Sequence, residues 1–459
     1  MWRETHVYLR RKKIWFSLLF FAFIFNPKPS QAAPNPLQKD IDNAIKKGVK
    51  YLLSRQIPQG HWDVDTFSGY PLGSTALITL TLLKCGVSPN HIAIRRAFNY
   101  MNQLPFQRTY SVALYIMALE ARYTPPKKIL KKYAKRHIRR TTVLRRRFRK
   151  YANRQDRARL LDAVNWLINN RNPDGVWSYA KSTYYDHSNT QYALLGLAAA
   201  ERLGVKIKSE VFFKVAEHFL KVQTPDGEQV QPFPVPAAEE PISHVLRKKL
   251  ERKWKHVPRR SRTVKRKAYA YGTSNKEQIY KARGWGYRAI TPSSDQKQRK
   301  ISPFFRAYGS MTVAGIACLV ICKAHLEKWA ARTYKWKKLR PELNRAIRDG
   351  CAWIAKNFSV QRNPGIGGWK WYYLYGLERA GVLSGIQYFG KYDWYLLGAK
   401  EILKEFQNNK DHISGQKGHG SSPEIRTCYA LLFLKRATVP LRQQPPTPKR
   451  VVTGAGYRR

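Results

Sequence analysis

The chain has 459 residues, of which 43% are hydrophobic and 13% aromatic, so it holds enough apolar material for a large core and is not disordered throughout. Its 85 Lys and Arg residues against 29 Asp and Glu give a formal net charge of +56, which attracts polyanions and anionic lipid head groups. It carries no nucleic-acid-binding motif, so we expect no nucleic acid partner, and five scattered cysteines exclude a disulfide framework.

Residues 1–33 have the pattern of a signal peptide. A basic stretch at 10–13 precedes an apolar run at 14–25, which is shorter than the roughly 20 residues that a membrane-spanning helix needs. Small residues up to Ala33 then offer a cleavage site. We therefore expect an exported protein, periplasmic or secreted. The alternative is an uncleaved segment that anchors the protein at its N-terminus.

From about residue 40 the chain repeats one unit: an amphipathic helix, a loop rich in Gly, Pro and Asp, and a more apolar helix. Residues 41–52 show the spacing of a one-faced helix, whereas 75–83 are apolar on nearly every side and Gly86 fits the end of that helix. The further pairs are expected at 94–101 and 111–119, 160–167 and 190–200, 211–222 and 312–322, 343–358 and 372–377, and 396–406 and 427–434. Six helical hairpins can close into a ring around a central cavity. The predicted fold class is therefore all-α, an α/α toroid over residues 34–437.

Two basic insertions interrupt the repeats. Residues 127–159 hold sixteen Lys and Arg against one acid, and 247–267 hold twelve against one. Such runs indicate either a docking surface for an anionic lipid or polymer or a solvated helical or disordered insertion, and solvated runs are the commoner case. The Pro-rich basic tail at 438–459 is expected to be disordered.

A spaced motif spans residues 47–62. Its positions are filled by Lys47, Gly48, Tyr51, Leu52, Gln56, Gly60 and Trp62. This series matches the QW motif, so the chain resembles the squalene–hopene and oxidosqualene cyclases, and the exported squalene-cyclase-like repeat proteins of planctomycete bacteria. The second half of the motif recurs at 166–177, with Arg171 in the place of Gln. The resemblance implies that Gln bonds the open N-terminal amides of a neighbouring helix while Trp stacks on it.

The resemblance also suggests where catalysis would lie. Class II cyclases protonate a double bond with an Asp-x-Asp-Asp-Thr motif, and the nearest segment here is 186–190, in which Asp186 keeps the first position. Ser188 and Asn189 stand in the places of the other two acids, and neither protonates an alkene as a carboxylic acid does. Ordinary polycyclisation is therefore not expected.

The related protein prenyltransferases hold zinc with an Asp-x-Cys pair and a His. Asp349 and Cys351 have that spacing but fall in an expected outer helix, and Arg426 fills the place of the His. Because Arg is not a zinc ligand, we predict neither a metal nor another cofactor.

The candidate site residues gather near the loop ends of the expected inner helices. The candidate catalytic residues are Asp186, His187, Asp63 and Asp65. The candidate ligand-binding residues are Trp285, Trp369, Trp371, Tyr373, Glu378, Glu424 and Arg426. The alternative interpretation is that Asp186 caps its helix and that the aromatic residues belong to the core.

Three classes of function stay open from the sequence. The first is a protein that binds or transforms an isoprenoid or another apolar lipid in a central cavity, with aromatic faces stabilising carbocations. The second is a noncatalytic scaffold for a protein or an anionic envelope polymer. The third is a polysaccharide lyase or hydrolase that uses paired carboxylates.

Overall fold

The computed structural model describes residues 36–64, 70–182, 184–239, 279–288, 303–408, 411–414 and 422–440. The expected signal peptide, Asp65, the insertion at 247–267 and the tail beyond Pro440 lie outside these residues. The described part is mostly helical, with fourteen α-helices. They are α1 (Pro36–Ser54), α2 (Pro71–Cys85), α3 (Ile92–Gln103), α4 (Thr109–Tyr123), α5 (Lys127–Lys135), α6 (Arg140–Tyr151), α7 (Arg154–Asn169), α8 (His187–Leu203), α9 (Ser209–Val222), α13 (Gly309–Trp329), α14 (Tyr334–Lys356), α15 (Lys370–Ser384), α16 (Trp394–Asn408) and α17 (Pro423–Lys435).

Two short antiparallel ribbons add the only described strands. β1 (Gln229–Val230) pairs with β2 (Tyr280–Lys281), and β3 (Tyr388–Phe389) pairs with β4 (Tyr392–Asp393). Each strand has two residues, so in the described part the ribbons connect loop segments and do not form an extended sheet.

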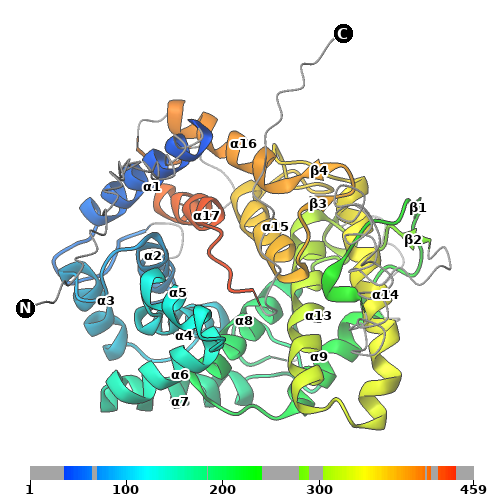
Figure 1. Ribbon diagram of the computed structural model, residues 1–459, viewed down its shortest axis with the longest axis horizontal. Helices are drawn as coiled ribbons and strands as arrows, with labels where there is room; N and C mark the ends of the chain where they lie inside the picture. The colour runs from blue at the N-terminus through cyan, green and yellow to red at the C-terminus, as the bar shows by residue number, and fades with distance from the viewer. Residues whose placement is uncertain are drawn as a thin grey trace, which may run out of the picture.

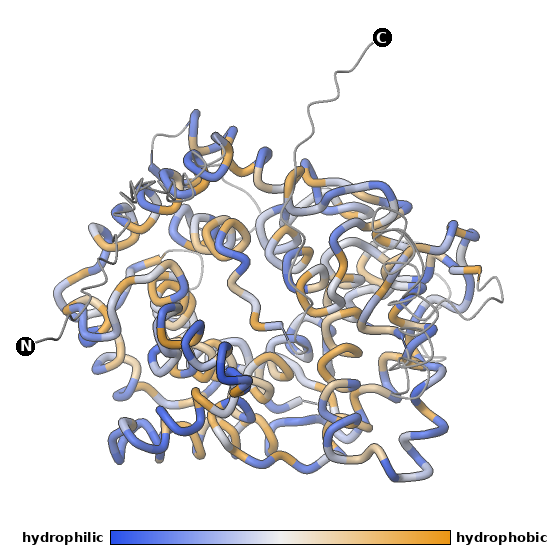
Figure 2. The backbone as a smooth tube through the Cα atoms, in the orientation of Figure 1, coloured by the Kyte–Doolittle hydropathy of each residue, from blue (hydrophilic) through white to orange (hydrophobic). Residues whose placement is uncertain are grey.

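Six helices form a closed series of contacts, which we call the inner cycle. α2 packs on α4, α4 on α8, α8 on α13, α13 on α15, α15 on α17, and α17 returns to α2. The other partner of each pair, namely α1, α3, α7, α9, α14 and α16, lies outside this cycle (Figure 1). Helices thus occupy all twelve expected ranges, and α1 packs on α2, α7 on α8, α9 on α13 and α16 on α17. Figure 2 shows hydrophilic residues gathered along the outer helices.

Burial explains why the two kinds of helix differ in sequence. α2 is buried at every position from Leu72 to Leu82, whereas α1 buries a single stripe that runs from Ile41 to Leu52. An outer helix has one neighbouring layer and needs one apolar face, whereas an inner helix has neighbours on all sides. Gly86 ends α2 with a φ of 104°, in the left-handed conformation that glycine adopts without strain.

α13 has the length and hydropathy of a membrane-spanning segment, alone among the described helices. However, 94% of its apolar window is buried inside the protein. Contacts with α8, α9, α14 and α15 surround it, so its apolar composition follows from its place in the inner cycle.

The first basic insertion is helical. It forms α5, α6 and the first turns of α7. α6 packs against α4 and α8 through Val143, Leu144 and Phe148, whereas α5 contributes no buried residue and packs on α6. The insertion therefore adds a layer outside the hairpins.

Candidate functional site

The QW motif forms a set of hydrogen bonds that tie one hairpin to the next. Trp62 is 2% exposed, and its indole Nε1 donates to the carbonyl of Leu52 at 2.6 Å. The Gln56 amide donates to the carbonyls of Gly60 and Ala93, each at 2.9 Å. Ala93 lies in the first turn of α3, as expected for a neighbouring helix. The expectation is corrected in one respect, because the Gln56 side chain donates to carbonyl oxygens and does not accept from open amides.

Gly60 is required in this loop by its backbone and its surroundings. Its φ is +97°, and an added Cβ would lie 2.6 Å from the carbonyl oxygen of Arg96. Any larger residue would have to push α3 away from the end of α1.

The indole of Trp177 likewise donates to the carbonyl of Leu167 at 2.8 Å, with Arg171 in the place of Gln. A copy with both Trp and Gln contacts explains Trp285, which the sequence suggested as a ligand-binding residue. Trp285 is fully buried, and its Nε1 donates to the carbonyl of Phe219 at 2.8 Å. Gln223, four residues after Phe219, donates to the carbonyls of Arg283 and Ala346 at 3.1 and 3.0 Å. These bonds match those of Trp62 and Gln56, so Trp285 packs in the core. About sixty residues separate the two halves of this copy, which hides it from a local motif search.

Asp186 occupies the N-cap position of α8 and is 1% exposed. Its carboxylate accepts hydrogen bonds from the backbone N–H of Asn189 at 2.7 Å, from the Asn189 amide at 2.7 Å and from the Ser188 hydroxyl at 2.5 Å. Burial raises the pKa of Asp186 above its usual value, although these bonds counteract the shift. Tyr287, from the 279–288 loop, also interacts with this carboxylate. The bonds to Ser188 and Asn189 match those of a helix cap.

The side chain of His187 bonds to groups other than Asp186, so the two residues do not form an acid–base pair. Its Nδ1 lies 2.6 Å from the carbonyl oxygen of Gly286, and its Nε2 lies 3.1 Å from Nε2 of His218 on α9. Burial lowers the pKa of His187 to about 4. Both ring nitrogens are therefore engaged in holding the 279–288 loop and α9.

The remaining acidic candidates do not join this pair. Asp63 is exposed and directly follows buried Trp62, and Asp65 lies outside the described residues. Glu378, on α15, is fully buried and accepts from the N–H and hydroxyl of Thr438. Burial raises the pKa of Glu378 to about 7. Glu424 accepts from the Tyr51 hydroxyl at 2.9 Å and pairs with Arg55 at 3.3 Å, which ties α17 to α1.

The aromatic and cationic candidates are also spread out. Trp369 precedes α15 with a φ of +64° and is 43% exposed, Trp371 is half-buried beneath Lys370, and Tyr373 is fully buried. Arg426 lies at the start of α17, with Nε 3.5 Å from the carbonyl of Ile413. The structure does not bring these side chains together into one pocket.

Tyrosines fill the centre of the inner cycle. The sequence suggests Tyr372 and Tyr375 as residues that could line a cavity, but not Tyr110 and Tyr192. Tyr110 lies 4.3 Å from Tyr192 between ring centroids, and its hydroxyl is 3.2 Å from that of Tyr372. Arg379 lies over Tyr375, 4.0 Å from the ring centroid. These residues come from α4, α8 and α15, so packed side chains occupy the axis where an apolar cavity was expected.

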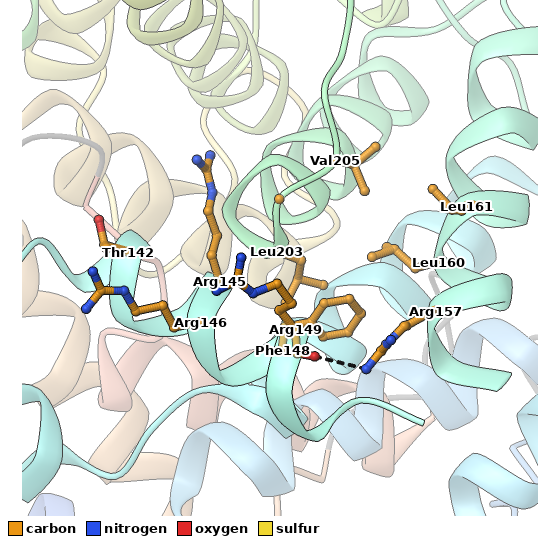
Figure 3. A pocket seen from close by; sticks show the side chains of 11 residues that line it. Thr142, Arg145, Arg146, Phe148, Arg149, Arg157, Leu160, Leu161, Leu203 and Val205 are labelled. Carbon is orange, nitrogen blue, oxygen red and sulfur yellow. Dashed lines mark hydrogen bonds between the residues drawn. The ribbon is translucent and has the colours of Figure 1, made fainter. Parts of the chain in front are cut away.

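A groove of about 730 Å³ lies outside the inner cycle, between α6, α7 and the end of α8. Figure 3 shows arginine side chains from α6 and α7 around it and aliphatic side chains along it. We call it the arginine groove. It is lined by Thr142, Arg145, Arg146, Phe148, Arg149, Arg157, Leu160, Leu161, Leu203, Gly204 and Val205.

The arginines of this groove have few internal partners. Arg145 donates to the backbone carbonyl of Glu201 at 2.8 Å and Arg157 to that of Arg149 at 2.9 Å. Among the described residues, no Asp or Glu forms an ion pair with Arg145, Arg146, Arg149 or Arg157. Four cationic groups are thus free to bind an anion above an apolar floor.

Within the described ranges, no group of three or more His, Cys, Asp or Glu side chains is placed to hold a metal ion. No protein-family model matches the chain, and a search of curated proteins found no matching sequence.

Proposed function

We propose that the protein is an α/α toroid similar to the squalene-cyclase and prenyltransferase superfamily. Three observations support this architecture: helices at the twelve expected ranges, the closed contacts of the inner cycle, and the hydrogen bonds from Trp62, Trp177 and Trp285 to backbone carbonyls, two of them accompanied by Gln bonds. Because the same fold supports many activities, the architecture alone does not assign a reaction.

We further propose that the protein is an exported, noncatalytic scaffold that binds an anionic lipid surface. The arginine groove carries this proposal. Its volume lies within the range of ligand-binding pockets, and guanidinium groups bind phosphate oxygens through paired hydrogen bonds. Leu161, which is 52% exposed, and Val205 offer apolar surface beside the cationic groups.

The surroundings of the groove favour a lipid over a purely polar anion. α5 is a basic amphipathic helix, and its Ile129 is 37% exposed. Trp329, at the end of α13, is 52% exposed beneath Lys328, whose own pKa is lowered by burial and by the positive charges of Arg145 and Arg139. Exposed Trp beside Lys and Arg is typical of side chains that enter the head-group region of a bilayer.

Two features weigh against the enzymatic alternatives. Asp186 and His187 use their polar atoms to hold α8 and its neighbours, and tyrosines with Arg379 pack the axis. A lyase or hydrolase would need a pair of carboxylates facing a groove, and the arginine groove has none in its lining. We therefore place binding at the outer surface rather than in a central cavity.

Vesicle binding tests this proposal. The mature protein should sediment with vesicles that contain phosphatidylglycerol and not with pure phosphatidylcholine, and binding should weaken with salt. The double variant Arg145→Gln with Arg149→Gln should lose about 2 kcal/mol of binding, roughly thirtyfold, because each basic residue near such a surface contributes about 1 kcal/mol.

The control is a second double variant with the same loss of charge, Arg345→Gln with Arg362→Gln, whose exposed side chains lie on α14 and the loop after it. Its affinity should stay within about twofold of the wild type. Equal losses in both variants would show that net charge alone drives binding and would contradict the groove. Retention by dextran sulfate without vesicle binding would instead support an anionic polymer as the partner.

A further inference from the structure

A small chamber lies between the helices of the inner cycle, separate from the arginine groove. Its volume is about 30 Å³, which is enough for one water-sized occupant. After α17 the chain turns toward the centre of the cycle, and residues 437–439 close the chamber (Figure 1). It is lined by Leu80, Lys84, Met117, Glu120, Leu195, Ala198, Arg202, Ile321, Tyr375, Arg379, Leu383, Ala437, Thr438 and Val439.

Arg379 is the central charged group of this chamber. It is fully buried, and its terminal nitrogens lie 3.2 Å from the Gln191 carbonyl oxygen and 3.5 Å from the Tyr192 hydroxyl. Its Nε and the amide nitrogen of Gln191 have no hydrogen-bond partner among the described residues. Arg379 lines the chamber, and a buried donor without an acceptor is costly unless an occupant of the space accepts its hydrogen bond.

The acids near the chamber are already engaged. Glu120 accepts two hydrogen bonds from Arg202, at 2.6 and 2.9 Å, and Glu378 accepts from the N–H and hydroxyl of Thr438. Lys84 and Arg379 form no ion pair with a carboxylate in the described part of the chain.

The charges around the chamber therefore do not balance. Lys84, Arg202 and Arg379 supply three positive charges to the lining, and Glu120 supplies one negative charge. Glu201, which acts on Arg202, and Glu378, whose pKa burial raises to about 7, add at most two more negative charges from beside the chamber. Arg140 adds another positive charge that acts on Glu120 and Arg202 from outside. A buried cation without a counter-charge is strongly unfavourable, because a low-dielectric interior replaces its hydration poorly.

We propose that the chamber binds one monovalent anion of chloride size, between Lys84 and Arg379. One negative charge balances the excess, and the occupant accepts hydrogen bonds from donors that lack a partner. The volume admits a single small ion and is too small for a phosphate or a lipid head group together with its shell of donors. Because Thr438 and its neighbours complete the wall, binding of the anion also holds the segment after α17 in place.

The test measures thermal unfolding of the full mature protein at constant ionic strength, with sodium gluconate exchanged stepwise for sodium chloride or bromide. An anion that binds only the folded state raises the unfolding temperature in proportion to the logarithm of its concentration once the site is saturated. Lys84→Met removes the excess charge and should abolish this dependence. Lys50→Met, at an exposed position on α1, should retain it.

A direct observation accompanies this comparison. Crystals grown in bromide should show an anomalous scattering peak between Lys84 and Arg379. A peak there, together with loss of the chloride effect in Lys84→Met alone, supports the proposal. An unfolding temperature that does not respond to chloride, a response that is equal in the Lys84→Met and Lys50→Met variants, or bromide crystals without this peak would each overturn it.

Discussion

His187 and His218 face each other with their Nε2 atoms 3.1 Å apart, which joins α8 to α9. His187 Nδ1 can only donate to the carbonyl of Gly286, so its Nε2 accepts from His218. Both rings are neutral in this arrangement. The residue that sequence reasoning offered as an acid–base catalyst is thus a neutral link between two hairpins.

The neutral pair predicts a loss of stability in acid. Burial lowers the pKa of His187 to about 4 and that of His218 to about 3. The unfolded chain therefore binds protons as the pH falls below about 6.5, while the folded chain does not. Stability from His187 is full above pH 6.5 and should fall by about 3 kcal/mol between pH 6.5 and pH 4. Urea unfolding at several pH values measures this slope.

The variant His218→Gln serves as the control for that measurement. Its amide keeps a donor toward His187 but no longer titrates, so the slope between pH 6.5 and 4 should become shallower. An unchanged slope in the variant would assign the acid sensitivity to other groups.

Substitutions of Asp186 test whether this residue caps α8 or belongs to a reaction centre. Asn keeps an oxygen that accepts from the Asn189 N–H, so Asp186→Asn should change the free energy of unfolding by less than about 1 kcal/mol. Asp186→Ala removes the acceptor and should cost about 2 kcal/mol. Ligand binding by the folded Asn variant should match the wild type. If the stable Asn variant instead loses turnover or ligand affinity by tenfold or more, the site assignment is correct.

The buried indole of Trp62 should be a major contributor to stability. Trp62→Ala should destabilise the protein by about 3–5 kcal/mol, as measured by urea unfolding, because it removes a large side chain that is 2% exposed. Trp329→Ala, at a position 52% exposed, should change the free energy by about 0.5 kcal/mol or less. Comparable losses at the two positions would be inconsistent with the packing described for Trp62.

Gln56 and Gln223 offer a sharper test of the motif than the tryptophans do. Each amide donates to two carbonyl oxygens, and a carboxylate in its place would face both with no donor. We expect Gln56→Glu and Gln223→Glu to destabilise more than the matching Ala variants, which should cost about 1–3 kcal/mol each. Thermal unfolding of the four variants decides the point. A Glu variant as stable as the wild type would contradict the donor arrangement.

Export is a prediction from the sequence alone. The basic and apolar segments within residues 1–33 lead us to expect that the native protein begins near Ala33. N-terminal sequencing of the protein from its own cell envelope measures this directly. An intact Met1 in a cytosolic fraction would refute export, and an intact Met1 in the membrane fraction would favour the anchor.

The helices could be predicted from the sequence because their cause is local. An inner helix such as α2 must be apolar on all sides and an outer helix such as α1 on one, and both patterns repeat within a few turns. The QW motif at 47–62 was recognisable for the same reason, since Gln56 and Trp62 lie in one continuous segment.

The surroundings of the candidate site residues depend on contacts between distant segments, and no local sequence pattern contains such contacts. Trp285 belongs to a motif whose Gln223 stands about sixty residues earlier, so only packing identifies it as core. Both ring nitrogens of His187 are engaged, one by Gly286 and the other by His218, which come from two other segments. The unbalanced charge of Arg379 arises where several helices and residues 437–439 meet. Periodicity fixes which face of a helix is buried, but the partner of a buried polar group is chosen by the tertiary structure, because that group must find its hydrogen bond or counter-charge wherever the chain returns.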